Sequence, residues 1–376
     1  MPLRRGLFLA TAVWLCLGAA ARAVPDMGAQ PLLSAHAITE LRWMPDSRAL
    51  AVNTDSALVL VEPAGPRTLI SAYGDLSPQK ETVVFVDPGG RLRLQRLADE
   101  SVRDLGLSGA LPQWAPSGNR FAFYTDGVCA NPGTPAPSCP PAGLAAADLA
   151  AADLTPLVPG LDPADNFAWL PNGSGVVYYH RGELGIARLD AATNTVLFQA
   201  TPFPCPAEAP YRPSVAVAAR APRAAAFLFY DSNGDGAWGR DDAAALWVFD
   251  TDTGQGLHSN PRAWFLTPEE LAAGLRPDGI TWSPDGSILC YVGRDARGFF
   301  LMFLPFSGPM PSTVLRMQDM PMLPRWSPDG EAVAFVSLRA DATSPTGATA
   351  ELRLVRISDA PSGPVPGGAS QAPPAR

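Results

Sequence analysis

The stretch FYDSNGDGAWGRDDAAALWVFD, residues 229–250, carries acidic and amide side chains at the spacing of a calcium-binding loop. Calcium is a hard cation that collects about six to eight oxygen ligands, and a central glycine permits the bend that turns those oxygens inward. The template places ligands at loop positions 1, 3, 5, 7 and 12, which here are Asp231, Asn233, Asp235, Ala237 (through its carbonyl oxygen) and Asp242.

The last position of this loop departs from the usual pattern, because Asp242 stands where a glutamate is typical. The shorter side chain would bind through one oxygen or through water, which predicts a weak site. Several carboxylates in one short loop would repel each other without a cation, so we expect the calcium to be structural. The alternative is an acidic Asn-Gly and Asp-Gly turn that binds no metal.

The segments that flank the loop indicate what it is built into. AAAFLFY and ALWVFD are apolar and partly aromatic, which predicts strands and not the two helices that usually flank a calcium loop. The sequence therefore predicts a calcium loop between two strands of one sheet.

A hairpin pattern recurs along the chain. Each clear copy has a tryptophan and, two positions later, a proline. Two weaker copies have Leu76 and Arg220 in the tryptophan position, followed at the same spacing by Pro78 and Pro222. Proline presets φ for the turn and a following glycine tolerates a positive φ, so each copy predicts a β-hairpin. The five clear copies have a tryptophan, a proline two positions later and then an apolar strand, and they begin at Trp43, Trp114, Trp169, Trp282 and Trp326.

Each hairpin continues into two further strands. Residues 183–198, ELGIARLDAATNTVLF, read as strand, turn and strand. Residues 143–158, GLAAADLAAADLTPLV, favour a helix by their alanine content, but they align with the first segment at a constant offset. We therefore predict strand, turn and strand there as well.

Seven such units predict an all-β fold, a β-propeller of about seven four-stranded blades over residues 24–360, although six or eight blades would also suit the spacing. A β-sandwich is the alternative, but it gives no reason for one hairpin to recur along the chain. The last unit lacks a clear fourth strand, and residues 30–35, QPLLSA, form an unassigned strand. We expect this N-terminal strand to complete the last blade.

The W-S-P-D-G motif followed by an apolar strand, at Trp282 and Trp326, resembles the WD-like propeller repeat of the TolB family and its relatives. The resemblance covers nearly all of the chain after its first segment and implies a propeller. It implies no single function, because that family includes periplasmic scaffolds, propellers attached to peptidases and proteins of unknown role. TolB itself carries an α/β domain ahead of its propeller, whereas only about 20 residues separate the expected cleavage site from Trp43.

The two ends of the chain are expected to lie outside the propeller. Two arginines, an apolar run from Leu7 to about Ala20 and the sequence Ala-Arg-Ala at 21–23 predict a secretory signal peptide, residues 1–23. A cleaved signal would place the protein in the periplasm or outside the cell, with no transmembrane segment remaining. The alternatives are an uncleaved anchor and a lipoprotein acylated at Cys16. The tail, residues 361–376, has little to bury and is expected to be disordered.

Four cysteines follow the signal segment. Cys129 and Cys139 close a short loop, CANPGTPAPSC, that has no apolar periodicity, and they are the natural disulfide pair in an oxidising compartment. Two free thiols are the alternative. Cys290 lies in the apolar run ILCYV and is expected to be an inert buried thiol, whereas the pairing of Cys205 is left open.

Charge and loop placement favour a binding protein. The net charge is −8 and Lys80 is the single lysine, so the chain has no basic stripe for nucleic acid. The long insertions all fall on the face of the propeller opposite the Pro-Asp-Gly turns, and long loops on a rigid scaffold commonly bind partners. We therefore predict a monomeric, exported, non-catalytic scaffold that binds a protein, peptide or envelope component.

The alternative is an enzyme, a lyase or lactonase that acts in the propeller channel with calcium or another metal as Lewis acid. The chain has no G-x-S-x-G motif, and its three histidines fall in different units. First strands such as ELRW and LPQW are poor in carboxylates and histidines. These features favour the binding scaffold over the enzyme.

Overall fold

The computed structural model describes residues 31–127, 141–149, 154–161, 166–180, 183–191, 193–199, 214–230, 243–260, 279–295, 297–306, 312–341, 343–344 and 347–357. The predicted signal segment, the C-terminal tail, the predicted calcium ligands, Cys129, Cys139 and Cys205 lie outside these residues. The regular elements of the described part are all β-strands, and no helix there is long and apolar enough to cross a membrane.

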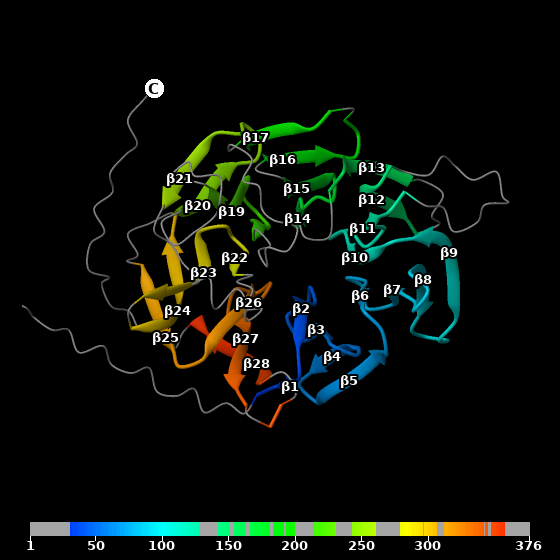
Figure 1. Cartoon of the computed structure of the whole chain (residues 1–376), viewed down its shortest axis with the longest axis horizontal. Helices are drawn as coiled ribbons and strands as arrows, with labels where there is room; N and C mark the ends of the chain where they lie inside the picture. Colours follow the sequence, from blue (N-terminus) through cyan, green and yellow to red (C-terminus); the bar gives the residue numbers. More distant parts are fainter. Residues whose placement is uncertain are drawn as a thin grey trace, which may run out of the picture.

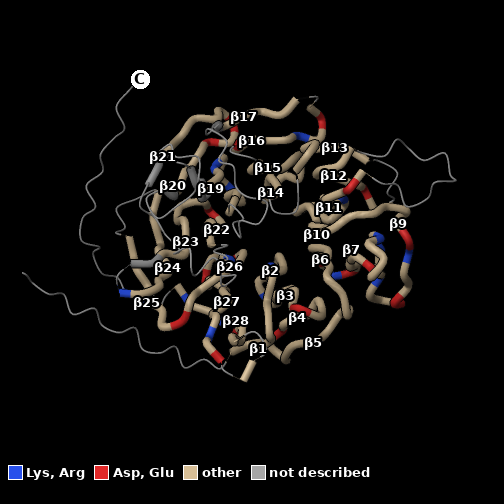
Figure 2. The backbone as a smooth tube through the Cα atoms, in the orientation of Figure 1, with Lys and Arg blue, Asp and Glu red and all other residues tan. Residues whose placement is uncertain are grey.

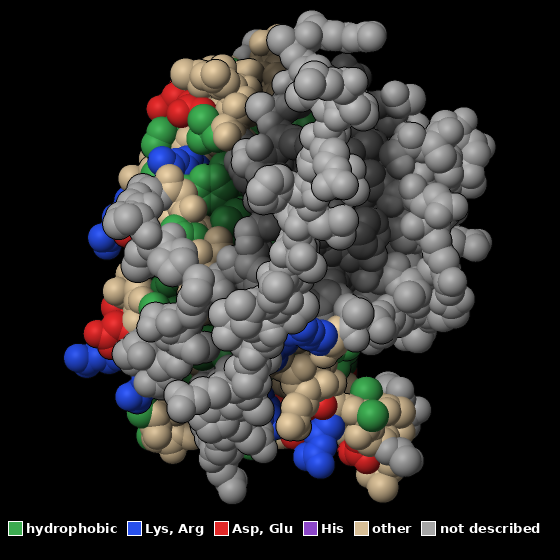
Figure 3. Space-filling view, turned by 90° about the vertical axis from the view of Figure 1, so that its left-hand side faces the viewer, with side chains coloured by type: hydrophobic (Ala, Val, Ile, Leu, Met, Phe, Trp, Pro, Cys, Tyr) green, Lys and Arg blue, Asp and Glu red, His purple; other side chains and the backbone are tan. Residues whose placement is uncertain are grey.

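The strands form seven sheets of four strands each, arranged in a ring (Figure 1). The chain is therefore a seven-bladed β-propeller, as the hairpin repeat predicts. In blades 1 to 6 the strands follow sequence order from the axis to the rim, so that each blade is an antiparallel meander. Acidic and basic residues are interspersed round the rim (Figure 2), and both signs also occur on the side that Figure 3 presents.

The strands of the first four blades are β2 (Ile38–Trp43), β3 (Leu50–Thr54), β4 (Leu58–Glu62) and β5 (Gly65–Ile70) in blade 1, β6 (Gly74–Leu76), β7 (Thr82–Val86), β8 (Arg91–Arg96) and β9 (Val102–Ser108) in blade 2, β10 (Ala110–Trp114), β11 (Arg120–Thr125), β12 (Gly143–Asp148) and β13 (Leu154–Pro159) in blade 3, and β14 (Asn166–Trp169), β15 (Gly175–His180), β16 (Glu183–Arg188) and β17 (Thr195–Gln199) in blade 4. The strands of the other three are β18 (Val215–Val217), β19 (Arg223–Tyr230), β20 (Ala243–Asp250) and β21 (Gly256–Asn260) in blade 5, β22 (Ile280–Trp282), β23 (Ile288–Asp295), β24 (Gly298–Pro305) and β25 (Thr313–Met317) in blade 6, and β26 (Met320–Trp326), β27 (Ala332–Ala340), β28 (Ala348–Arg356) and β1 (Leu33–Ala35) in blade 7.

Blade 7 contains strands from both ends of the propeller. β1 pairs antiparallel with β28, with Leu33 opposite Leu352 and Ala35 opposite Ala350. The sheet order β1-β28-β27-β26 makes the N-terminal strand the outermost of the four. The prediction that an N-terminal strand completes the last blade is confirmed by Leu33–Ala35, and backbone hydrogen bonds thereby close the ring.

The turn after the first strand has a common geometry in six of the seven blades. In blade 3 the N–H of Ala115, which follows Trp114, bonds to the carbonyl oxygen of Arg120 at 2.9 Å. Gly118 then has a φ of 72°, a conformation that glycine adopts without steric cost. The corresponding residue also has a positive φ in five other blades, where it is Ser47, Lys80, Gly173, Gly286 or Gly330.

Blade 5 shows that one expected register was wrong. There the N–H of Ala218 bonds to the carbonyl oxygen of Arg223 at 2.9 Å, and Val217 lies opposite Ala224. Val217 therefore takes the tryptophan position, three residues before the expected Arg220. The proline misled the alignment, because Pro222 lies directly before β19 and not at the second position of the turn.

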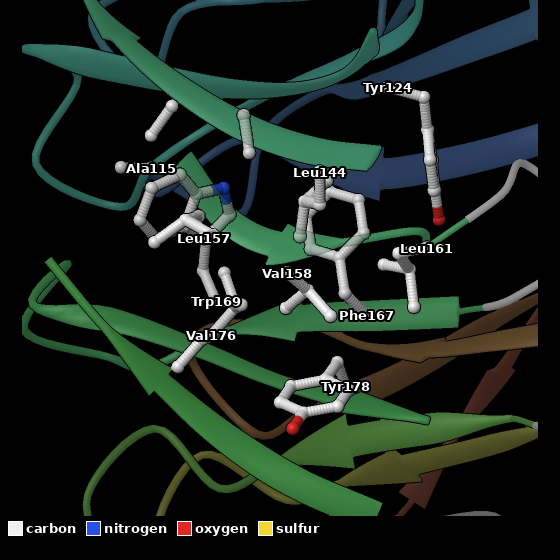
Figure 4. Packing of buried hydrophobic residues seen from close by; sticks show 13 residues of the cluster. Ala115, Tyr124, Leu144, Leu157, Val158, Leu161, Phe167, Trp169, Val176 and Tyr178 are labelled. Atoms are coloured by element: carbon white, nitrogen blue, oxygen red, sulfur yellow. The ribbon is translucent and has the colours of Figure 1, made fainter. Parts of the chain in front are cut away.

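The core consists of apolar layers between neighbouring blades. The described residues form seven buried clusters, one for each pair of adjacent blades. In Figure 4, which shows the cluster between blades 3 and 4, Trp169, Val176 and Tyr178 lie across from Leu144 and Leu157. A blade covered on both faces can be apolar on both, which explains the continuous apolar runs of the middle strands.

The alanine-rich segment of blade 3 forms two strands, as the alignment predicts and contrary to its helix propensity. β12 pairs with β11, with Phe123 opposite Ala145 and Phe121 opposite Ala147. Both alanines are fully buried. Tertiary burial in a closed sheet therefore outweighs a local preference worth only a few tenths of a kcal/mol, roughly, for each residue.

Candidate functional site: the axial cavity

A cavity of about 600 Å³ lies at the axis of the ring. The first strand of every blade contributes to its wall. Pro45, Pro78, Pro116 and Pro328 also line it, so the cavity reaches the face of the propeller that carries the proline turns. A cavity of this volume suits a small ligand.

Two layers of side chains face the cavity, because alternate residues of a strand share one face. Glu40, Tyr73, Leu111 and Asn166, three positions before the tryptophan or its equivalent, form the deeper layer. The other layer consists of the residue directly before the tryptophan or its equivalent in each blade, which is Arg42, Asp75, Gln113, Ala168, Ala216, Thr281 or Arg325.

Arg42 and Asp75 form an ion pair between blades 1 and 2, with Nη2 lying 2.7 Å from Oδ1. Asp75 is 5% exposed, and its Oδ2 accepts a 2.7 Å hydrogen bond from the N–H of Trp114 in blade 3. Burial raises the pKa of Asp75, whereas the charge of Arg42 and the Trp114 N–H oppose that rise. Arg42 also donates to the carbonyl oxygen of Leu76. Asp75 thus connects three blades.

Glu40 lies close to this pair, and its Oε2 accepts a hydrogen bond from the hydroxyl of Tyr73. The side chain is partly exposed to the cavity, yet the surrounding protein buries it enough to raise its pKa from the usual 4.5 to about 6. The negative charge of Asp75 adds to the rise, whereas the Tyr73 hydrogen bond and the charges of Arg325 and Arg42 oppose it. Glu40 can therefore exchange a proton close to neutral pH.

Blades 4 to 6 form a different wall. At the positions that carry charged residues in blades 7, 1 and 2, they have Ala168, Ala216 and Thr281. The Thr281 hydroxyl accepts a 3.2 Å hydrogen bond from the N–H of Trp326, so it also joins two blades. The cavity is therefore charged on one side and largely apolar on the other.

This arrangement can bind a polar or charged group and exchange a proton. The guanidinium groups of Arg42 and Arg325 and the amide of Gln113 are donors, and the Glu40 carboxyl can donate or accept. The lining residues include no histidine or cysteine, and the described residues contain no group of three or more His, Cys, Asp or Glu side chains placed to hold a metal ion.

The charged wall was not predicted from the sequence, which indicated first strands poor in carboxylates. That expectation is wrong for blades 1 and 2, where Glu40 and Asp75 both line the cavity. Asp75 lies before Leu76 in one of the weaker copies of the hairpin, where no tryptophan marks the register. The alternation of Glu40 with Arg42, and of Tyr73 with Asp75, at matching positions is the signal that could have found the site.

The strands round the predicted calcium loop are as expected. β19 ends at Tyr230, β20 begins at Ala243, and these two residues lie opposite each other in an antiparallel pair. The chain therefore leaves β19 and enters β20 at neighbouring points of the sheet, as a hairpin connection requires. The loop that contains the predicted disulfide joins its strands in the same way, with Thr125 opposite Gly143.

Cys290 is a free, fully buried thiol, as predicted. It belongs to the apolar cluster between blades 6 and 7, and burial raises its pKa far above the ordinary value. A thiol in that environment is a poor nucleophile.

Comparisons with known proteins identify a fold and no family. No protein-family model matches the chain, and no curated protein matches it. The structure of TolB from Acinetobacter baumannii is 14% identical, with 77% of this chain and 66% of that chain covered and a TM-score of 0.42. Hydrazine synthase from Kuenenia stuttgartiensis is 10% identical, with 88% and 99% covered and a TM-score of 0.54. The chain spans just under two thirds of the TolB chain. The expected propeller is shown by the seven four-stranded sheets themselves.

Proposed function

We propose that this protein is an exported, non-catalytic propeller that binds a protein, peptide or envelope component on the face opposite the proline turns. The support is the asymmetry of the connections. The turns after the first strands are short in all blades, whereas segments 126–142 and 231–242 join the second and third strands of blades 3 and 5. Long segments held at strand ends of a rigid ring are typical binding elements.

A bound calcium ion and a disulfide would each restrict one of these long segments. Calcium would bind the carboxylates of Asp231, Asp235 and Asp242 with the Asn233 amide and the Ala237 carbonyl, and so cancel their mutual repulsion. A disulfide between Cys129 and Cys139 would restrict the other segment. Peptide mass mapping without reductant tests this bond, and recovery of both cysteines as separate thiols from exported protein would refute it.

Export depends on the signal segment 1–23. Cleavage predicts a mature chain that begins near Val24 and is recovered from the periplasm or the medium as a monomer. Mass spectrometry of the protein from fractionated cells tests this. An acylated Cys16 at the new N-terminus would establish the lipoprotein alternative instead.

The alternative function is a metal-assisted lyase or lactonase that acts in the axial cavity. It is favoured by the raised pKa of Glu40, since perturbed acids are common at catalytic sites. The binding scaffold is supported better, because both lining carboxylates lie on one wall and Asp75 is occupied by Arg42 and the Trp114 N–H.

A pull-down from envelope extract tests the proposal most simply. The mature chain is used as bait with calcium and with a chelator, and the variant Asp235→Asn serves as a second way to disable the loop. We expect one partner that is recovered with calcium and reduced by the chelator and by the variant. Recovery of no partner under any condition would contradict the scaffold.

A further inference from the structure

The axial cavity has a polar wall and an apolar wall. The charged residues Arg325, Glu40, Arg42 and Asp75 line the cavity from blades 7, 1 and 2. Blades 4 to 6 contribute mainly apolar side chains, together with Asn166 and Thr281. The residues of the polar wall interact across blade boundaries, as the ion pair of Arg42 with Asp75 shows. A cavity with this division suits a ligand that has a polar head and an apolar body.

The charged side chains of the polar wall differ in how far they are exposed to the cavity. Asp75 is buried and bonded to Arg42 and to the N–H of Trp114. Arg325 and Glu40 are partly exposed to the cavity. When Glu40 is protonated, the wall carries the two positive charges of Arg42 and Arg325 and the single negative charge of Asp75. Its net charge is then one positive charge.

We propose that the axial cavity binds a small monocarboxylate, with its carboxylate against the guanidinium groups of Arg325 and Arg42 and its apolar body against the wall that includes Ala168 and Ala216. This site is separate from the loop face. A planar guanidinium matches a carboxylate with two parallel hydrogen bonds. A cationic ligand would instead meet two guanidinium groups.

A monocarboxylate fits the charge better than a phosphate monoester does. The ester carries between one and two negative charges near neutral pH, roughly 1.5 to 2. It would be placed close to Asp75 and Glu40, against a wall whose net charge is at most one. The single charge of a carboxylate balances the wall when Glu40 is protonated.

Binding of the acid is expected to take up a proton. The charged and titratable groups that act on Glu40 are Asp75 and Tyr73 from blade 2, Arg42 from its own strand and Arg325 from blade 7. A bound carboxylate adds a negative charge to this set, which favours the protonated form of Glu40. The affinity therefore falls as the pH rises through about 6.

Isothermal titration calorimetry of the mature protein tests the site with octanoate and hydrocinnamate, each compared with its own amide and with inorganic phosphate. We expect the acids to bind at about pH 6 and at least about tenfold more weakly at about pH 8, and the amides and phosphate to bind at least about tenfold more weakly than the acids. Repeating the titration in buffers of different ionisation enthalpy measures the proton uptake.

Three variants locate the site. Arg325→Gln is expected to lower the affinity for the acids by at least about tenfold, and Arg325→Lys by less. Glu40→Gln should keep the binding but lose its pH dependence and its proton uptake. Arg96→Gln, which removes an exposed guanidinium from the outer part of blade 2, is the matched control and should bind like the wild type.

Three results would overturn the proposal. These are wild-type protein that binds neither acid at about pH 6, amides that bind as tightly as the acids, and an Arg325→Gln variant that retains full affinity. If Arg325→Gln does not fold, the Lys variant and the proton uptake of the wild type decide the question. Because no loop residue is involved, these outcomes do not depend on a partner for the loop face.

Discussion

Trp114 and Asp75, on neighbouring blades, are joined by two hydrogen bonds. The indole Nε1 of Trp114 donates to the carbonyl oxygen of Asp75 at 2.9 Å, and its backbone N–H donates to the Asp75 carboxylate at 2.7 Å. Trp43 bonds in the same way to the carbonyl oxygen of Arg325, and Trp169 to that of Gln113. The recurring tryptophan therefore connects each of these blades to the one before it.

Loss of the indole hydrogen bond should lower the free energy of unfolding only in blades whose tryptophan forms that bond. Trp282 is as well buried as Trp114, but its Nε1 has no hydrogen-bond partner in the described part of the chain. We expect Trp114→Phe to lower the free energy of unfolding by about 1–2 kcal/mol more than Trp282→Phe, since only the first leaves an acceptor without its donor. Urea denaturation of both variants measures this, and equal losses would show that the indole bond contributes nothing.

The ion pair of Arg42 and Asp75 should contribute more to the free energy of unfolding than the exposed pair of Lys80 and Asp46. Asp75→Ala leaves Arg42 without its partner in a part-buried site, and we expect a loss of about 3–5 kcal/mol. The matched control is Asp46→Ala, which removes a 2.7 Å ion pair with Lys80 at the surface and should cost less than about 1 kcal/mol. Thermal or chemical unfolding of the two variants decides the point, and a smaller loss for Asp75→Ala would refute it.

Much of the fold could be predicted from the sequence because a propeller repeats its turn chemistry. The Trp-x-Pro spacing located the first two strands of blades 1, 3, 4, 6 and 7. The constant offset between residues 143–158 and 183–198 predicted strands in blade 3 in spite of the helix preference of its alanines. Blade 5 was misaligned because Pro222 stands outside the turn position that it was assigned. In blade 2, which also lacks the tryptophan, Leu76 and Pro78 gave the right register, because Pro78 does stand at the second position of the turn.

The charged wall of the cavity could not be predicted with the same ease. Glu40 and Asp75 are 35 positions apart in the chain (75 − 40), and each looks like an ordinary polar residue of a short strand. The closure of the ring brings them together with Arg325, which comes from the opposite end of the chain. Proximity of this kind depends on blade number and closure, which a repeat pattern specifies only approximately.

Glu40 gives stability a specific pH dependence. Its pKa in the folded protein, about 6, is above the usual 4.5, so the folded state holds the proton more tightly than the unfolded state does. Its contribution to stability therefore falls as the pH rises from about 4.5 to about 6 and is constant above that range. Glu40→Gln should remove this fall and raise the stability at neutral pH by about 2 kcal/mol.

Denaturation of the wild type and Glu40→Gln at about pH 4.5 and pH 7.5 measures this effect. The advantage of the variant should grow with pH. Asp46→Asn is a useful contrast, because the hydrogen bond from Lys80 lowers the pKa of Asp46 and its contribution is lost as the pH falls. An advantage of Glu40→Gln that is independent of pH would contradict the assignment.

Calcium binding to loop 231–242 predicts a free energy of unfolding that increases with the concentration of free calcium. At a calcium concentration about tenfold above the dissociation constant, binding to the folded state alone adds about 1.4 kcal/mol. Asp235→Asn should abolish this increment, and Asp55→Asn, a change in an exposed turn of blade 1, should preserve it. Melting curves with calcium and with a chelator test the loop. Identical curves for the wild type would show that the loop is a turn that binds no calcium.

The face that binds the partner is the central claim, and site-specific photo-cross-linking tests it most directly. A photoreactive residue is placed at Thr134 or Trp238 in the long segments, or at Asp46 or Asp329 in the turns of the opposite face, and each protein is irradiated in envelope extract. The account predicts one shared partner adduct from both long segments and none from the turns. A partner adduct from either turn position, or no adduct from either long segment, would contradict it.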